Sequence, residues 1–155
     1  MKIRVYYEDT DLGGIVYHAN YIKYCERARS ELFFQKGIMP TLKEGSGFVV
    51  RNLNATFVDT STLGDLLEIK TDIVTLKNSS VILVQEIWRD EKKLFSMEIV
   101  LVYVDKGKPC RIPDIFREVF KTFQLAKRCV TATANAEAPI YPAPNRNDEI
   151  SFKSG

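Results

Sequence analysis

Side chains that could do chemistry gather in one short segment near the start of the chain. Between Tyr6 and Tyr21 lie three acidic residues, four tyrosines and the one histidine of the sequence, His18. The acids are Glu8, Asp9 and Asp11. A carboxylate placed just before a helix lies near N–H groups that stabilise negative charge on a substrate oxygen. Such a pair could attack an activated acyl group such as a thioester, although a solvated acidic turn followed by core tyrosines fits the same residues.

Other common catalytic motifs are missing or incomplete. Gly45-Ser46-Gly47 is not the G-x-S-x-G turn of a serine hydrolase, and no glycine-rich phosphate loop precedes a Lys-Ser/Thr pair. A single histidine excludes a multi-histidine zinc site. Cys25 falls on the apolar stripe of a predicted helix, which favours packing over nucleophilic attack. We therefore expect neither a metal nor a cofactor.

Composition is that of one globular domain. The chain has 155 residues and a net charge of +2, too balanced for a protein that grips nucleic acid. The sequence has no run of about 18 apolar residues, which a membrane-spanning helix would need. The first residues lead directly into a strand-like pattern without a targeting signal, and three widely spaced cysteines fit reduced thiols. The sequence therefore predicts a cytoplasmic protein.

Hydrophobic periodicity predicts an α+β domain. An alternating pattern over residues 3–8 indicates a strand, and helical spacing over residues 19–36 indicates a long helix closed by Gly37. Four further strands are expected at about 49–57, 67–73, 81–89 and 95–104, and Pro113 opens a short helix with Phe116 and Phe120 on its apolar side. Val49 and Leu53 share one face of the first of these strands, and the last carries an unbroken period-two apolar row from Phe95 to Tyr103. Long strands joined by short turns favour an antiparallel sheet covered by the early helix. We expect a domain over residues 1–128 and a flexible tail over 129–155.

The acidic segment resembles a known family. The pattern D-x-x-G-I-V-Y-H-x-x-Y, which runs from Asp11 to Tyr21, is similar to the 4-hydroxybenzoyl-CoA thioesterase class of hotdog proteins. A longer string, V-Y-Y-E-D-T-D-x-x-G-x-V-Y-H-A-N-Y-x-K-Y-C-E-R-A-R-S-E from Val5 to Glu31, more closely resembles the Tol–Pal-associated, YbgC-like acyl-CoA thioesterases. The resemblance extends to about Phe123.

The resemblance implies a fold, an activity and a set of site residues. The fold would be a five-stranded antiparallel sheet wrapped around one long helix, with subunits joined edge to edge as a homodimer or homotetramer. The substrate would be acyl-CoA, with an acyl-carrier protein as an alternative donor. Asp11 would act as nucleophile or general base, and the backbone N–H of His18 would hold the carbonyl oxygen. The His18 side chain and Tyr7 would assist, and Gly14 and Tyr17 would contact substrate.

One departure from the family concerns a turn that borders its site. Relatives commonly carry Pro-Ala where this chain has Thr60-Ser61. This difference leaves the acyl-chain preference open.

Two alternative functions use the same fold. A dehydratase acting on 3-hydroxyacyl thioesters would have Pro-Gly near its histidine, whereas His18 precedes Ala19-Asn20. A non-catalytic docking module for acyl-carrier proteins or lipid enzymes would not need the Asp11 and Gly14 that this chain retains.

Independently of the resemblance, a sheet with one covering helix leaves a strand edge, which predicts at least a dimer.

Overall fold

The computed structural model describes residues 1–127 and confirms the α+β class. The predicted tail, 129–155, lies outside the described residues. The elements in chain order are β1 (Lys2–Arg4), the 3-10 helix η1 (Tyr7–Asp9), α1 (His18–Phe34), β2 (Ser46–Phe57), β3 (Leu66–Leu76), β4 (Ser80–Arg89), β5 (Lys92–Asp105), β6 (Lys108–Pro109) and α2 (Asp114–Lys127). No helix among these residues is long and apolar enough to cross a membrane.

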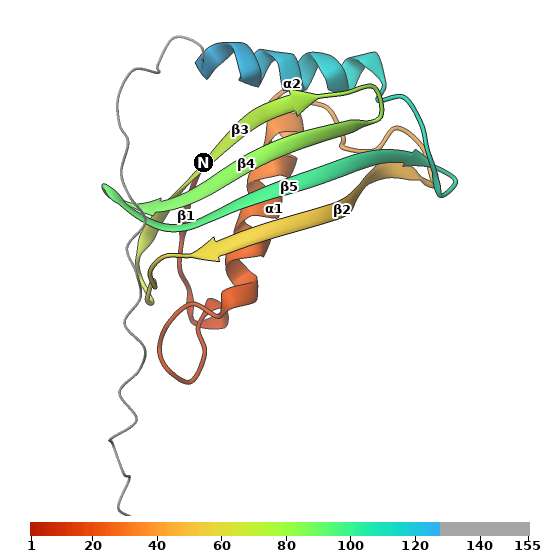
Figure 1. Ribbon diagram of the computed structural model, residues 1–155. Helices are drawn as coiled ribbons and strands as arrows, with labels where there is room; N and C mark the ends of the chain where they lie inside the picture. Colours follow the sequence, from red (N-terminus) through yellow and green to blue (C-terminus); the bar gives the residue numbers. More distant parts are fainter. Residues whose placement is uncertain (128–155) are drawn as a thin grey trace, which may run out of the picture.

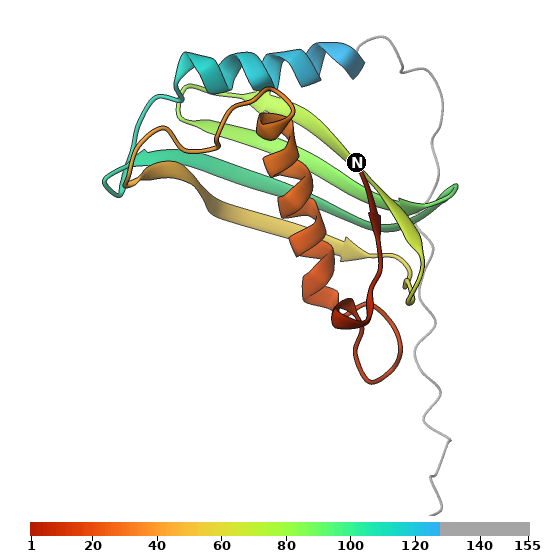
Figure 2. The same ribbon diagram turned by 180° about the vertical axis from the view of Figure 1, so that it is seen from behind.

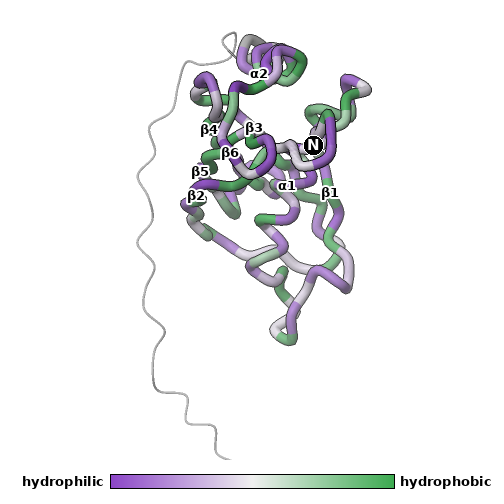
Figure 3. The backbone as a smooth tube through the Cα atoms, turned by 90° about the vertical axis from the view of Figure 1, so that its right-hand side faces the viewer, coloured by the Kyte–Doolittle hydropathy of each residue, from purple (hydrophilic) through white to green (hydrophobic). Residues whose placement is uncertain are grey.

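The sheet is antiparallel throughout and curls around α1. Its strand order is β1-β3-β4-β5-β2, and the two-residue β6 pairs with β5. Figures 1 and 2 show α1 lying across the concave face, with the loop that precedes it at the foot of the helix. Seen from the side in Figure 3, β1 and β2 lie on opposite sides of α1. The predicted wrapped, hotdog-type arrangement of five main strands is confirmed.

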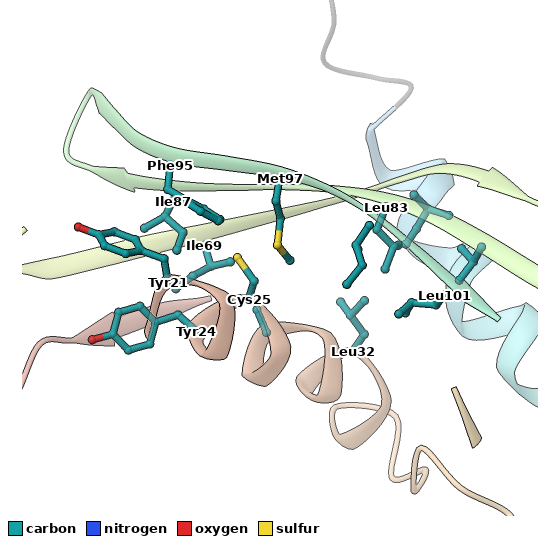
Figure 4. Packing of buried hydrophobic residues seen from close by; sticks show 14 of the residues in the cluster. Tyr21, Tyr24, Cys25, Leu32, Ile69, Leu83, Ile87, Phe95, Met97 and Leu101 are labelled. Carbon is teal, nitrogen blue, oxygen red and sulfur yellow. The ribbon is translucent and has the colours of Figure 1, made fainter. Parts of the chain in front are cut away.

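The core lies between α1 and the concave face of the sheet. The period-two row predicted on β5 is buried along its whole length: Phe95, Met97, Ile99, Leu101 and Tyr103. Tyr21, Cys25 and Leu32 face this row from α1 (Figure 4). Cys25 is fully buried, and burial raises the pKa of its thiol to about 12, as expected for a packing cysteine.

A bulge changes the predicted face of β2. The sequence pattern placed Val49 on the same face as Leu53, but the pairing with β5 shifts between Val50 and Asn52. The extra residue reverses the alternation, so Phe48 packs against the core while Val49 is exposed. β2 is the outer strand next to β5, and no strand among the described residues pairs with its other edge.

The first strand is shorter than predicted. It ends at Arg4, and Tyr7–Asp9 form a 3-10 turn instead of continuing the alternation to residue 8. The Asp9 carboxylate accepts the Tyr6 N–H at 2.8 Å, and this local bond favours the turn over the extended chain. Tyr7 is consequently 82% exposed and does not join the core.

The two helices follow their predicted apolar faces. α1 begins one residue before the predicted start and ends two before the predicted end, with the Gly37 N–H bonded to the Phe34 carbonyl. α2 packs Phe116, Val119 and Phe120 inward, and two of these rings contact Phe33 at the end of α1. The C-terminal helix thus closes the end of the core opposite the acidic loop (Figure 1).

Candidate active site

The loop between η1 and α1 is a small closed hairpin. Its base is formed by a bridge between Thr10 and Val16 and by a bond from the Tyr17 N–H to the Asp9 carbonyl at 2.9 Å. Inside it, the Asp11 N–H donates to the Ile15 carbonyl at 2.9 Å. These bonds order the loop that carries Asp11, which lies at the foot of α1 (Figure 2).

The Asp11 carboxylate is exposed and held by the backbone. Its Oδ1 accepts the Gly13 N–H at 2.8 Å, and the Gly14 N–H donates to the Asp11 carbonyl at 3.0 Å. Gly14 has φ of +75°, a conformation that favours glycine, and this allows the turn. The backbone around Asp11 is therefore ordered, while the other carboxylate oxygen, Oδ2, is left accessible to solvent.

The N-terminus of α1 offers uncompensated N–H groups. Tyr17 is the N-cap but makes no side-chain capping bond, and the first turn carries no acidic residue. The Asn20 N–H is taken by the Tyr17 carbonyl at 2.8 Å, whereas the described contacts give the His18 N–H no acceptor. Since the first N–H groups of a helix have no partner within it, this end can hold a negatively charged oxygen.

Aromatic rings lead from this helix end into the core. The His18 ring lies 4.3 Å from that of Tyr17 and 6.3 Å from that of Phe57, which comes from the end of β2. Phe57 contacts Tyr21 and Phe95 in turn. These rings form an aromatic surface next to the helix N-terminus, on which Tyr17 and Phe57 are partly exposed.

The predicted site residues are brought together unequally. Asp11, Gly14, Tyr17 and His18 all lie on the loop and the first turn of α1. Tyr7 lies on η1, where its carbonyl accepts both the N–H and the hydroxyl of Thr10, and the described hydrogen bonds and ring pairs do not link its side chain to Asp11 or His18. Its predicted role is therefore the one that the geometry of this chain supports least.

Asp9 differs from the other two acids of the segment. The sequence offered Glu8, Asp9 and Asp11 as equivalent solvated groups if no chemistry occurs here, but Asp9 is only 5% exposed. Its carboxylate accepts the Tyr6 N–H, and its charge, after burial itself, helps to raise the pKa of the Tyr24 hydroxyl. Figure 4 shows Tyr24 and Tyr21 with their hydroxyls directed to the same side. Asp9 is thus a buried residue with a structural role in this turn.

The Thr60-Ser61 turn directly contacts the loop that carries Asp11. The Ser61 carbonyl accepts the Val16 N–H at 2.8 Å, and Ile15 bridges to Thr62. The buried Ser61 hydroxyl lies 2.9 Å from the Tyr21 hydroxyl, which also accepts the Ser61 N–H. A change from the family's usual residues in this turn is therefore in contact with the candidate site.

Gly13 and Asn20 were not singled out by sequence reasoning as members of the site. Asn20 carried a readable signal, because asparagine is a poor helix former that nevertheless occupies the first turn of α1. Gly13 carried none, since its importance lies in a contact with Asp11 that only the fold creates.

The candidate site is open, and the described residues form no metal cluster. Within residues 1–127, no group of three or more His, Cys, Asp or Glu side chains is placed to hold an ion. A groove of about 360 Å³ lies further along α1, beside the first half of β2, and is lined by residues that include Arg29, Phe33, Phe48 and Val50. Asp11 and His18 of the same chain do not line it.

Comparisons with known proteins agree on one family. The model of the thioesterase superfamily matches residues 13–96. The acyl-CoA thioesterase YbgC of Helicobacter pylori is 45% identical over 130 residues, covering 77% of this chain and 97% of the relative. The acyl-CoA thioester hydrolase YbgC of Escherichia coli O157:H7 is 39% identical over 127 residues, covering 77% and 92%. A solved structure, a probable thioesterase from Bartonella henselae, superposes with a TM-score of 0.69 at 35% identity and covers 73% and 97%.

Proposed function

The chain belongs to the thioesterase superfamily, and we propose that Asp11 and the N-terminus of α1 carry its reaction, the hydrolysis of acyl-CoA to a free acid and CoA. The chain is an acyl-CoA thioesterase on the strength of its YbgC relatives. The observation that supports our choice of residues is the Asp11 carboxylate, fixed by the Gly13 N–H at 2.8 Å in the loop that leads into α1. The region that the family model matches begins at residue 13, two residues after Asp11.

The proposed oxyanion site is the backbone N–H of His18. As the thioester carbon becomes tetrahedral, its carbonyl oxygen gains negative charge, which an N–H donor and the positive end of a helix stabilise. The absence of an acid in the first turn of α1 leaves this positive potential unopposed. The carbonyl then re-forms as the C–S bond breaks and CoA leaves as a thiolate.

Asp11 has two possible roles on this path. As a nucleophile, its free oxygen attacks the thioester carbon, expels the CoA thiolate and forms a mixed anhydride that water then hydrolyses. As a general base, it takes a proton from water while the resulting hydroxide attacks, and the departing thiolate is protonated afterwards. Both routes give the same products and require the same placement of the carboxylate.

The remaining residues are proposed to bind and orient the substrate. Gly14 allows the tight turn without a side chain that would obstruct the substrate. Tyr17 and the His18 ring, with Phe57, offer an apolar surface to the acyl group. Tyr7 is exposed on η1, and we assign it a contact with substrate rather than with Asp11.

The active form is proposed to be a homodimer, or a homotetramer made of two dimers. Within residues 1–127 no strand pairs with the outer edge of β2, which exposes Val49, Val50 and Phe57 and suits pairing with β2 of a second copy. In an antiparallel two-fold pairing, the start of one β2 meets the end of the other. The groove near Phe48 and Val50 of one copy would then lie beside Phe57 and His18 of its partner. Such a site would be shared between subunits.

The compartment and the acyl donor complete the proposal. Cys25 and Cys110 are free thiols, which fits the reducing cytoplasm where we place the enzyme. Acyl-CoA is the proposed donor, and an acyl-carrier protein carrying the same thioester is the alternative.

A panel of acyl-CoA substrates, with chain length varied and aromatic acyl groups included, tests the function. Release of free CoA, followed with a thiol reagent, is the expected result. Hydration of an enoyl-CoA without thiol release would contradict it, as would the absence of any turnover. The same panel offered as acyl-carrier-protein thioesters identifies the preferred donor, and light scattering under assay conditions gives the oligomeric state. An active monomer would refute the shared site.

A further inference from the structure

Asn20 is a buried polar residue with an unusual partner. It lies in the first turn of α1, is 6% exposed, and its side-chain Nδ2 donates to the backbone carbonyl of Asp9 at 2.8 Å. The two residues are eleven positions apart in the sequence. Local helix preference does not explain asparagine here, because it is a poor helix former in this position compared with alanine. The bond to Asp9 is the reason that the structure supplies.

The Asp9 carbonyl is the point where loop and helix are joined. It accepts two hydrogen bonds, one from the Tyr17 N–H at 2.9 Å and one from Asn20 at 2.8 Å, so both of its lone pairs are used. The first bond closes the loop at its base. The second fixes that base to the first turn of α1. Asp11 lies two residues after Asp9 in the sequence, and His18 lies one residue after Tyr17.

We propose that Asn20 is a positioning residue for the thioesterase reaction: its side chain holds the Asp11 loop at a fixed place relative to the His18 N–H. This inference rests on the proposed roles of Asp11 and His18. Attack on a thioester requires the carboxylate and the oxyanion donor to face one carbonyl group, and a misplacement of about 1 Å can cost on the order of a hundredfold in rate. Asn20 touches neither group and acts through the backbone of Asp9.

A neighbouring bond provides a matched control. Ser61 is buried like Asn20, and its hydroxyl bonds to Tyr21 of α1 at 2.9 Å, but this bond joins the helix to the β2–β3 turn and not to the loop that carries Asp11. Ser61→Ala keeps the backbone bonds of Ser61 to Val16 and Tyr21. It therefore removes a buried side-chain bond to α1 without releasing the junction at Asp9.

The test measures kcat, KM and thermal stability of Asn20→Ala, Asn20→Asp and Ser61→Ala in the full chain, using the acyl-CoA that the wild type hydrolyses fastest. We expect Asn20→Ala to lower kcat by about ten- to a hundredfold with KM changed less than about threefold. Its stability should fall little, because alanine is the better helix former. Asn20→Asp keeps the shape but replaces the donor with an acceptor, so its kcat should fall at least as far. Ser61→Ala should keep kcat within about threefold of wild type.

A double variant separates positioning from general damage. If Asn20 acts by placing Asp11, then adding Asn20→Ala to Asp11→Asn should reduce the residual rate less than about threefold. Independent, multiplying losses would overturn the proposal, as would a wild-type kcat in Asn20→Ala or in Asn20→Asp. A wild type that releases no CoA would instead refute the proposed function itself, so the two failures are distinguishable.

Discussion

The backbone of Gly13 is packed closely against the carboxylate of Asp11. Its N–H lies 2.8 Å from Asp11 Oδ1, and a Cβ added at Gly13 would stand 3.1 Å from the same oxygen. A carbon and a carboxylate oxygen at that separation are in tight contact, so a side chain at position 13 would push the carboxylate from its place. The glycine therefore both binds Asp11 and leaves room for it.

Gly13→Ala is expected to reduce kcat by about tenfold while the protein folds with near-normal stability, because the displaced group is the exposed end of a side chain. Gly14→Ala is the comparison. It meets nothing within 4 Å, but its φ of +75° is strained for alanine and should lower the free energy of unfolding by about 1 kcal/mol. Urea unfolding and steady-state kinetics on both variants check this division. Equal kinetic losses in the two would show that loop strain, and not contact with Asp11, controls the rate.

Asp9→Asn should damage stability more than catalysis. The Asp9 carboxylate is buried and accepts the Tyr6 N–H at 2.8 Å. An asparagine at this position replaces one carboxylate oxygen with an NH2 group, which would be a buried donor with no acceptor provided for it. We expect the free energy of unfolding to fall by about 1–3 kcal/mol, with kcat of the folded enzyme within about tenfold of wild type. Urea unfolding at pH 7 measures the first and initial rates measure the second. A variant as stable as wild type would mean that the buried charge has no structural role.

The sequence predicted the elements well where periodicity was long and regular. The row from Phe95 to Tyr103 and the apolar stripe of α1 are both buried as expected. Side chains that face the core recur at every second residue in a strand and at every third or fourth residue in a helix, so a long regular pattern identifies them. Predictions failed where a single local bond overrides the period. The Asp9–Tyr6 bond turns the chain after β1, and the bulge before Asn52 reverses the alternation of β2.

The candidate site was predictable only in part, for a related reason. Asp11 and His18 are recognisable by motif and by their position before and at the start of a helix. Asn20 acts through a partner eleven residues away, and such a pairing exists only in the folded chain. Asp9 and Asp11 are two residues apart and chemically alike, yet one is buried and the other exposed. Composition cannot distinguish them.

The buried thiol of Cys25 should make the free energy of unfolding decrease as the pH rises into the alkaline range. Burial raises the pKa of Cys25 to about 12 in the folded protein, whereas an unfolded thiol has a pKa of about 8.5. The folded state therefore retains a proton that the unfolded state loses. The contribution of Cys25 is fully present below about pH 8.5 and decreases as pH rises towards 12, by up to about 1.4 kcal/mol per pH unit.

Cys25→Ala isolates this contribution. Between pH 8.5 and 10 the free energy of unfolding of wild type should fall by about 1.6 kcal/mol more than that of the variant. Urea titrations at three pH values in this interval measure the difference, from which the ionisation of unfolded tyrosines cancels because wild type and variant share it. Tyr24, whose pKa is also raised mainly by burial, should add a loss of the same sign above pH 10. Parallel pH dependences of wild type and variant would show that Cys25 ionises equally in both states.

Asp11→Asn should abolish most of the activity with little effect on folding or binding. The substitution keeps size and the acceptor for the Gly13 N–H but removes the charge that attacks the thioester or takes a proton from water. Loss of such a group commonly costs on the order of 10²–10⁴ in rate, so kcat should collapse while KM changes little. Glu8→Gln is the matched control, because Glu8 is an exposed acid of the same segment. It should leave kcat and KM close to wild type.

A trapping experiment and labelled water, both with the wild type, separate the two roles of Asp11. If Asp11 is the nucleophile, an acyl-enzyme should be trapped at Asp11 and not in Asp11→Asn, and a single turnover in oxygen-18 water should label the Asp11 carboxylate when water attacks the Asp11 carbon of the anhydride. If it is the general base, no acyl-enzyme should be trapped and all label should appear in the released acid. Retention of more than about a tenth of kcat by a normally folded Asp11→Asn would contradict both roles. Catalysis would then rest on the helix N-terminus and bound water, since the His18 N–H is a backbone group that the substitution leaves in place.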